Sequence, residues 1–189
     1  MSRRVGILVL NRLEALRQAK KSGALARRVA PRELTHESVF RHYRGFDGVV
    51  WPQLEHPHFQ TEDGLASTDD SAAVDLYVSE LPAGDEYDVI VLARLEVNQA
   101  TLGENGWHLA GFDVGYFDSE WSLFSVVLNE IVYGLCPDLR HFTTVLNEHL
   151  LIPTLEQAFE IVKERERVEA MGADLERAEH IEPIGIFIR

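Results

Sequence analysis

The sequence predicts a single α+β domain over residues 1–189, in which an antiparallel meander sheet is packed by C-terminal helices. Three observations support this fold class. The length of 189 residues is that of one ordinary domain, and an apolar fraction of 46% is enough for one hydrophobic core. Segments with strand character, separated by turn sequences, gather in the middle of the chain. Apolar residues at helical spacing follow in the last third.

The part of the chain up to residue 71 is expected to hold one strand, two helices and a long loop. The apolar run over residues 5–10 predicts a short buried strand, with a continuous helix over residues 5–21 as the alternative. Helical spacing and helix-end signals favour helices over residues 11–23 and 31–44. Residues 49–71 carry prolines, a glycine and a polar cluster, which is the composition of a loop. A loop this long within a compact domain is often functional.

Three consecutive strands are expected over residues 73–79, 87–97 and 107–115. In the first, apolar side chains alternate with polar ones, as in a half-buried strand: Val74, Leu76 and Val78 against Asp75, Tyr77 and Ser79. Turn sequences containing proline or glycine lie between the strands. Short links between consecutive strands favour an antiparallel meander.

The last third of the chain is expected to be helical, apart from a closing strand. Residues 122–133 are apolar and show no strand alternation, which favours a helix. A second helix is expected over residues 138–150. A third is expected over residues 154–171, where Thr154 opens a capping box. Residues 183–188 have the pattern of a strand.

Charge is distributed unevenly along the chain, whose formal net charge is −13. The basic N-terminal segment, residues 1–44, holds eleven Lys or Arg and three acids, a net of +8. The acidic body, residues 45–189, holds seven basic residues and 28 acids, a net of −21. This asymmetry indicates either that the basic segment docks on the body or that the body attracts a basic protein. The acidic body is not expected to bind nucleic acid, because it would repel phosphates.

Two clusters have the residue types of a metal site. Asp113, Asp118 and Glu120 lie around the end of a predicted strand, where carboxylates could hold Mg²⁺ or Ca²⁺. His56 and His58 form a His-x-His pair that could contribute to a metal-dependent hydrolase. Neither cluster has the spacing of a known site, and no nucleotide-binding or nucleophile motif occurs. We therefore expect no metal, no cofactor and no catalytic residue.

The compartment is predicted from cysteine usage and hydropathy. Cys136 is the only cysteine, so it cannot form an internal disulfide, and we expect a buried structural thiol in a reducing compartment. The apolar runs are shorter than the roughly 18–20 residues that span a bilayer, and the run over residues 5–10 is not followed by a cleavage site. These features favour a soluble, cytoplasmic protein without a membrane partner.

One stretch resembles a known class of proteins. Residues 109–114 are expected to form a strand ending in Gly-Phe-Asp-Val, a polar loop follows over 116–121, and residues 122–129 are expected to form a helix from Ser122 to Asn129. This order resembles that of some bacterial immunity proteins, which are small cytoplasmic inhibitors of secreted or contact-delivered toxins. The resemblance covers about 20 residues of the chain. It implies a protein without enzymatic activity whose partner is a toxin domain.

If the protein binds a toxin, the long loop is the expected contact surface. It lies in a stretch from Gly45 to Ala93 that has no Lys or Arg and eleven acids. A dense anionic surface speeds encounter with a cationic partner, and an aromatic side chain within it can anchor the complex. The predicted contact residues combine both kinds: Trp51, Glu55, Phe59, Glu62, Asp63, Asp69 and Asp70.

Overall fold

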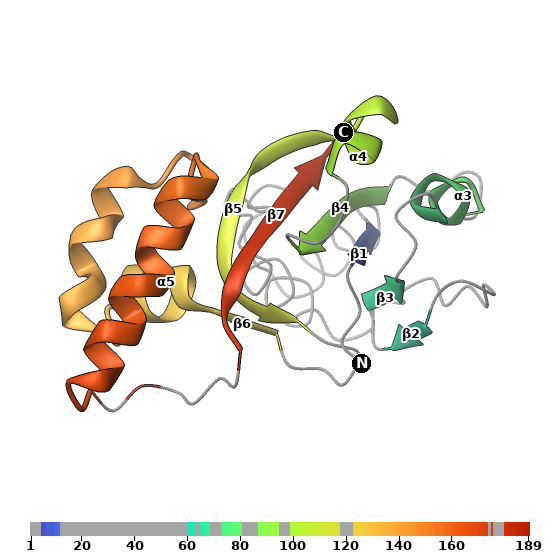
Figure 1. The fold of residues 1–189 in the computed structure, drawn as a ribbon. Helices are drawn as coiled ribbons and strands as arrows, with labels where there is room; N and C mark the ends of the chain where they lie inside the picture. The colour runs from blue at the N-terminus through green and yellow to red at the C-terminus, as the bar shows by residue number, and fades with distance from the viewer. Residues whose placement is uncertain are drawn as a thin grey trace, which may run out of the picture.

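The computed structural model describes residues 5–11, 60–62, 65–68, 73–80, 87–94, 99–117, 123–173, 175 and 180–189. This part of the chain contains helices and one antiparallel sheet (Figure 1), which confirms the α+β class. The sheet consists of β1 (Val5–Asn11), β2 (Gln60–Glu62), β3 (Leu65–Thr68), β4 (Tyr87–Arg94), β5 (His108–Phe117), β6 (Leu123–Ser125) and β7 (Glu182–Ile188). Its strand order is β2-β3-β1-β4-β7-β5-β6.

The start of the chain forms a strand within the sheet. β1 pairs along its whole length with β4, from Val5 opposite Ala93 to Asn11 opposite Tyr87. The predicted strand over residues 5–10 is therefore confirmed, and the alternative helix over residues 5–21 is wrong. The helices expected over residues 11–23 and 31–44 lie outside the described residues, apart from the end of β1.

The predicted loop over residues 49–71 contains two short strands. β2 and β3 pair with each other, from Gln60 opposite Ser67 to Glu62 opposite Leu65, and β3 also pairs with β1. The interpretation as an uninterrupted loop was wrong, because it rested on polar composition. Main-chain hydrogen bonds join strands whatever the side chains are, and short polar strands are common at sheet edges.

The strands do not follow one another as a meander. β7, predicted as a closing strand, lies between β4 and β5, with Val91 opposite Phe187 and Asp113 opposite Ile184. Residues 183–187 of β7 are all buried. A strand that is apolar on both faces needs a covered, central position, which explains why the end of the chain enters the middle of the sheet.

Residues 73–79, predicted as the first strand of the meander, form helix α3 (Val74–Ser79) instead. The alternation of apolar residues was misleading. Leu76 is 50% exposed, whereas Tyr77, which a strand would have turned to the polar face, is 1% exposed. Burial of Val74 together with Tyr77, three residues apart, follows the period of a helix. The strand predicted over residues 87–97 is β4, and that over 107–115 is β5.

Two predicted helices have different forms. Residues 122–133 contain the short strand β6 followed by the π-helix η2 (Val127–Val132). All side chains from Phe124 to Ile131 are buried, so no amphipathic period marks the change from strand to helix. In place of a helix over residues 138–150, the 3₁₀ helix η3 (Pro137–Val145) forms. The turn after it is organised by Asn147, whose side-chain oxygen accepts hydrogen bonds from the main chain of His149 and Leu151.

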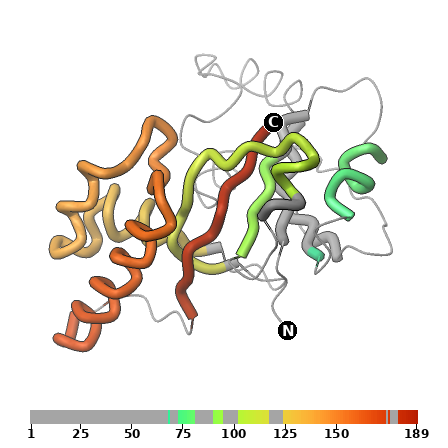
Figure 2. The backbone as a smooth tube through the Cα atoms, turned by 45° about the horizontal axis from the view of Figure 1, so that its top comes forward, coloured from blue at the N-terminus to red at the C-terminus, as the bar shows by residue number. Residues whose placement is uncertain are grey.

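Helix α5 (Leu155–Ala170) confirms the third predicted helix and packs against the sheet. The Thr154 hydroxyl accepts a hydrogen bond from the main-chain amide of Gln157, as the capping box predicts. α5 and η3 lie beside β5 and β7, and α3 lies on the opposite side of the molecule (Figure 2). The core under α5 joins β5, β6, η2, η3 and α5, with side chains that include Phe112, Val114, Ile131, Leu139, Ile152 and Ile161.

A β-bulge in β5 allows the chain before α5 to approach the sheet. The register between β5 and β7 shifts between Leu109 and Gly111. Gly111 has a φ of +149°, and a Cβ atom there would lie 2.8 Å from the Cβ of Leu151. The neighbouring Phe112 and Ile152 exchange two main-chain hydrogen bonds of 2.8 Å. A glycine is therefore required where these two segments meet.

No helix in the described ranges is long and apolar enough to cross a membrane.

The short helix α4 (Gln99–Glu104) leads into β5 through Gly106, whose φ is +81°.

Candidate functional site

Most of the predicted contact surface lies outside the described residues. Glu62 is the exception, because it ends β2 and pairs with Leu65 of β3 through the main chain. The other predicted contact residues that fall outside are Trp51, Glu55, Phe59, Asp63, Asp69 and Asp70. His56 and His58, the predicted His-x-His pair, fall outside as well.

The surface of the described part carries more acids than bases. Its exposed basic residues are four: Arg140, Lys163, Arg167 and Arg189. Its exposed acids are eight: Glu80, Glu104, Asp138, Glu148, Glu156, Glu160, Glu166 and Glu169. The excess of negative charge in the composition is therefore also present on this part of the surface.

The carboxylate of Asp113 is fully buried at the junction of β5, β6 and η2. Its Oδ1 accepts hydrogen bonds from the Ser125 hydroxyl at 2.7 Å and from the Val114 amide at 2.8 Å. The Ser125 hydroxyl in turn accepts a hydrogen bond from the main-chain amide of Leu128 at 3.0 Å. The main-chain oxygen of Ser125 accepts one from the side-chain amide of Asn129 at 2.9 Å. Both the donor and the acceptor capacity of Ser125 are used. These bonds join the end of the sheet to the first turn of η2.

Asp113 is the member of the predicted metal cluster that the structure describes. Its side chain is fully buried and hydrogen-bonded, which indicates a structural function. Asp118 and Glu120 lie outside the described residues. Among the residues that the structure describes, no group of three His, Cys, Asp or Glu side chains could hold a metal ion. Cys136 is buried with a free thiol, as predicted.

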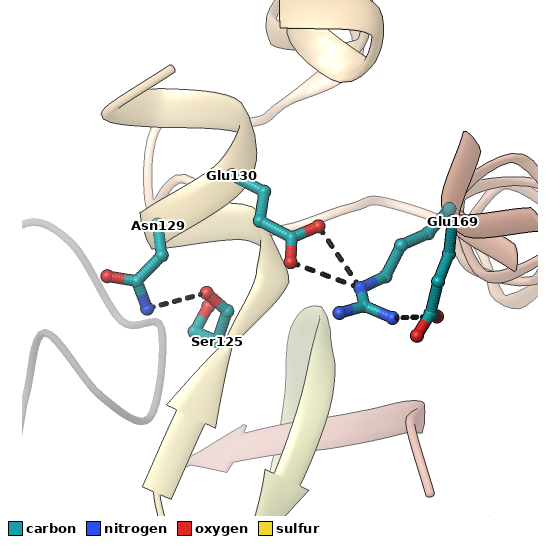
Figure 3. A network of polar contacts seen from close by, with 5 residues as sticks. Ser125, Asn129, Glu130 and Glu169 are labelled. Atoms are coloured by element: carbon teal, nitrogen blue, oxygen red, sulfur yellow. Dashed lines mark hydrogen bonds and ion pairs between the residues drawn. The ribbon is translucent and has the colours of Figure 1, made fainter. Parts of the chain in front are cut away.

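A buried ion pair joins η2 to α5. The Nε of Arg165 donates to both carboxylate oxygens of Glu130 at 3.1 Å, and both side chains are 3% exposed. Nη1 of Arg165 donates to Glu169 at 3.0 Å, and Glu169 is 43% exposed. Figure 3 shows Glu130 and Glu169 reaching the guanidinium from two sides. The pair of Glu130 with Arg165 joins the π-helix to α5, whereas Glu169 lies on α5 itself, one turn after Arg165.

Asp75, Trp107 and Arg189 form a second polar cluster, which reaches the surface. The indole Nε1 of Trp107 donates to Oδ1 of Asp75 at 3.1 Å. The guanidinium of Arg189 lies over the Trp107 ring, with Cζ 4.3 Å from the ring centroid. Its Nη2 donates to the same Asp75 oxygen and, at 3.2 Å, to the main-chain oxygen of Asn105. This geometry binds a guanidinium through its face and its edge.

Sequence reasoning identified only part of these clusters. Arg165 and Glu169 are four residues apart on a helix, a spacing that favours an ion pair, and the structure contains that pair. Glu130 lies 35 residues before Arg165, and Asp75 lies 114 residues before Arg189. No local pattern relates residues so far apart, and only the packing of the elements brings them together.

Comparison of the chain with protein-family models, curated proteins and solved structures finds no match.

Proposed function

We propose that this chain is a non-enzymatic protein-binding domain that neutralises a cationic toxin, in the manner of a bacterial immunity protein. The observation that supports the proposal is the charge of the acidic body, which holds seven basic residues and 28 acids. Fields of this sign raise the association rate with a cationic protein from about 10⁵–10⁶ M⁻¹s⁻¹ toward 10⁸ M⁻¹s⁻¹ or more at low salt. Fast capture suits an inhibitor that must reach a toxin before the toxin reaches its target.

The proposed contact surface is the acidic loop, by which we mean residues 51–70 together with their short strands β2 and β3. Its acids would steer the partner, while its aromatics would become buried and slow dissociation. Truncation of a buried aromatic anchor costs about 2 kcal/mol or more, against about 0.2–1 kcal/mol for one exposed ion pair. We therefore assign association to the acids and dissociation to the aromatics among Trp51, Glu55, Phe59, Glu62, Asp63, Asp69 and Asp70.

The alternative function, a metal-dependent hydrolase, has less support. Asp113 is the member of the proposed carboxylate cluster that the structure describes, and its Oδ1 already accepts from Ser125 and Val114. A ligand to Mg²⁺ or Ca²⁺ needs a carboxylate oxygen that can face the ion and its waters. The full burial of Asp113 favours a structural function for this residue.

The proposed compartment is the cytoplasm. Cys136 is a free, buried thiol, and a protein with a single cysteine needs no oxidising environment for its fold. A cytoplasmic inhibitor would meet a toxin domain after that domain has entered the cell.

Growth rescue tests the proposal. The gene adjoining that of this chain should encode a protein with a basic C-terminal domain, and expression of that domain should arrest a bacterial host. Coexpression of this chain should restore growth. Coexpression of a variant with Glu55, Glu62 and Asp63 changed to Lys should restore it less. A neighbouring gene without such a domain, or arrest that persists beside the native chain, would contradict the proposal.

A matched control separates local recognition from total charge. Glu156, Glu160 and Glu166 are exposed residues on α5, and changing all three to Lys alters the net charge by the same amount as the loop variant. The control variant should still restore growth. Equal loss of rescue in both variants would show that the loop has no special part in recognition.

A further inference from the structure

The cluster of Asp75, Trp107 and Arg189 has the composition of a guanidinium-binding site. The cation is held on three sides by different groups: the face of Trp107, the carboxylate of Asp75 and the main-chain oxygen of Asn105. An arginine side chain suits this arrangement because its planar guanidinium can stack on a ring while its edge donates hydrogen bonds. The compact ammonium of lysine cannot do both in the same way.

The groups that form the site also have contacts that do not involve the cation. Asp75 lies in α3, while Trp107 directly precedes β5 and is 2% exposed. The 3.1 Å hydrogen bond from the indole Nε1 fixes the carboxylate oxygen of Asp75 beside the ring. The ring, the carboxylate and the main chain should therefore keep their positions when Arg189 moves away, so the site is preorganised.

The site also opens to solvent, so a guanidinium can enter from outside. The side chain of Arg189 is 47% exposed and that of Asp75 is 34% exposed. Asn105 and Gly106, which flank the site on the chain before Trp107, are exposed as well. A second arginine could therefore take the position of Arg189 without a rearrangement of the core.

We propose that Asp75, Trp107 and the main-chain oxygen of Asn105 form a binding site for an arginine side chain of a protein partner, which Arg189 occupies in cis until the partner displaces it. The proposal deepens the proposed function, because a cationic toxin is the partner that would supply the arginine. Arg189 then competes with any external arginine for the site. A free arginine that binds weakly does not displace Arg189, whereas an arginine on a docked partner can.

Competition in cis determines the size of the effect. A tethered side chain acts at an effective concentration in the millimolar range, which is comparable to the affinity expected of one guanidinium for a small exposed site. If Arg189 leaves the site vacant for about one tenth of the time, the apparent affinity for an external guanidinium is about tenfold lower than the intrinsic affinity. Removal of Arg189 should recover that factor.

The experiment is a titration of the Arg189→Ala protein with N-acetyl-arginine amide, followed through the indole N–H resonance of Trp107. The resonance should shift with millimolar affinity, and the native chain should need about tenfold more of the probe for the same shift. N-acetyl-lysine amide should bind several-fold more weakly. Adding Asp75→Asn to Arg189→Ala should abolish the response to the arginine probe.

Arg140→Ala is the matched control, since Arg140 is an exposed arginine on η3. It should respond to the probe as the native chain does. If Arg189→Ala does not fold, Arg189→Gln replaces it, because glutamine retains a planar group and hydrogen bonds without the charge. A purely structural Arg189 would alter the Trp107 resonance on substitution but would not create a response to the probe.

The proposal is overturned if Arg189→Ala responds no more strongly than the native chain, or if its response is unchanged by Asp75→Asn. Because the titration contains no toxin, its result does not depend on growth rescue. If the titration fails and growth is rescued, only the proposal of an arginine site is contradicted. If the titration succeeds and growth is not rescued, only the proposal of a toxin partner is contradicted.

Discussion

Replacing Arg165 by Met should destabilise the fold strongly, because it leaves a buried carboxylate without its cation. Arg165 donates to both oxygens of Glu130, and both residues are 3% exposed. Methionine has a similar length and no charge, so it keeps much of the packing but removes the guanidinium. Glu130 would then hold a carboxylate in the interior without the cation that faces it.

The expected cost follows from the burial of the two carboxylates. Breaking a buried ion pair by removal of one partner costs about 3–5 kcal/mol. Glu169, the other carboxylate on Arg165, is 43% exposed and can be hydrated, so Glu169→Ala should cost about 1 kcal/mol or less. For a domain of this size each kcal/mol lowers Tm by about 2–4 °C, which gives a decrease of roughly 6–20 °C for Arg165→Met.

Urea unfolding followed by circular dichroism measures these costs, with Glu169→Ala as the control. The single variant Glu130→Met and the double variant Glu130→Met with Arg165→Met complete a double-mutant cycle. It should be more stable than Arg165→Met alone, because replacement of a whole buried pair by apolar residues is often neutral or better. The coupling energy between the two sites should exceed about 2 kcal/mol.

Two results would refute this reasoning. If Arg165→Met lowers the free energy of unfolding by less than about 1 kcal/mol, the pair is not buried as described. If the two single substitutions simply add in the double variant, Glu130 and Arg165 do not act as a pair.

Two further predictions concern the bulge and pH. Gly111→Ala should lower the free energy of unfolding in urea by about 2–4 kcal/mol, because the new Cβ would lie 2.8 Å from that of Leu151 at a φ of +149°. Gly106→Ala, which has open space around it, should lower it by about 1 kcal/mol. Equal costs would contradict the close approach. The hydrogen bond from Arg167 lowers the pKa of Glu164. The stability that this pair adds should therefore be present above the ordinary glutamate pKa of about 4.3 and lost as pH falls through the lower folded pKa. An NMR titration in which Arg167→Ala leaves the Glu164 pKa unchanged would contradict it.

The elements that could be predicted from sequence are those with strong local signals. The apolar runs that form β1 and β7, and the capping box at Thr154, each determine an element through neighbouring residues. α3 was mistaken for a strand because six residues fit both periods, and only the burial of Tyr77 separates them. η2 was partly missed because a segment buried on all sides shows no period.

Strand order and the buried polar clusters could not be predicted, since both depend on long-range packing. β1 pairs with β4 across more than 70 residues of sequence, and Glu130 meets Arg165 across 35. Asp113 illustrates the consequence for the site. Its position near other carboxylates in the sequence indicated a metal ligand. In the structure, the neighbouring strand β6 places the Ser125 hydroxyl against Asp113, where the two side chains form a buried hydrogen bond.

The most direct test of the toxin-binding proposal is the association rate with the growth-arresting domain encoded beside this chain, measured by stopped flow over a series of salt concentrations. The variant with Glu55, Glu62 and Asp63 changed to Lys should associate at least about tenfold more slowly at low salt, with a flatter salt dependence. The control with Glu156, Glu160 and Glu166 changed to Lys should stay within about threefold of the native rate. An unchanged rate and salt dependence in the loop variant, together with a fall in its Tm, would show that the acidic loop serves the fold and not recognition.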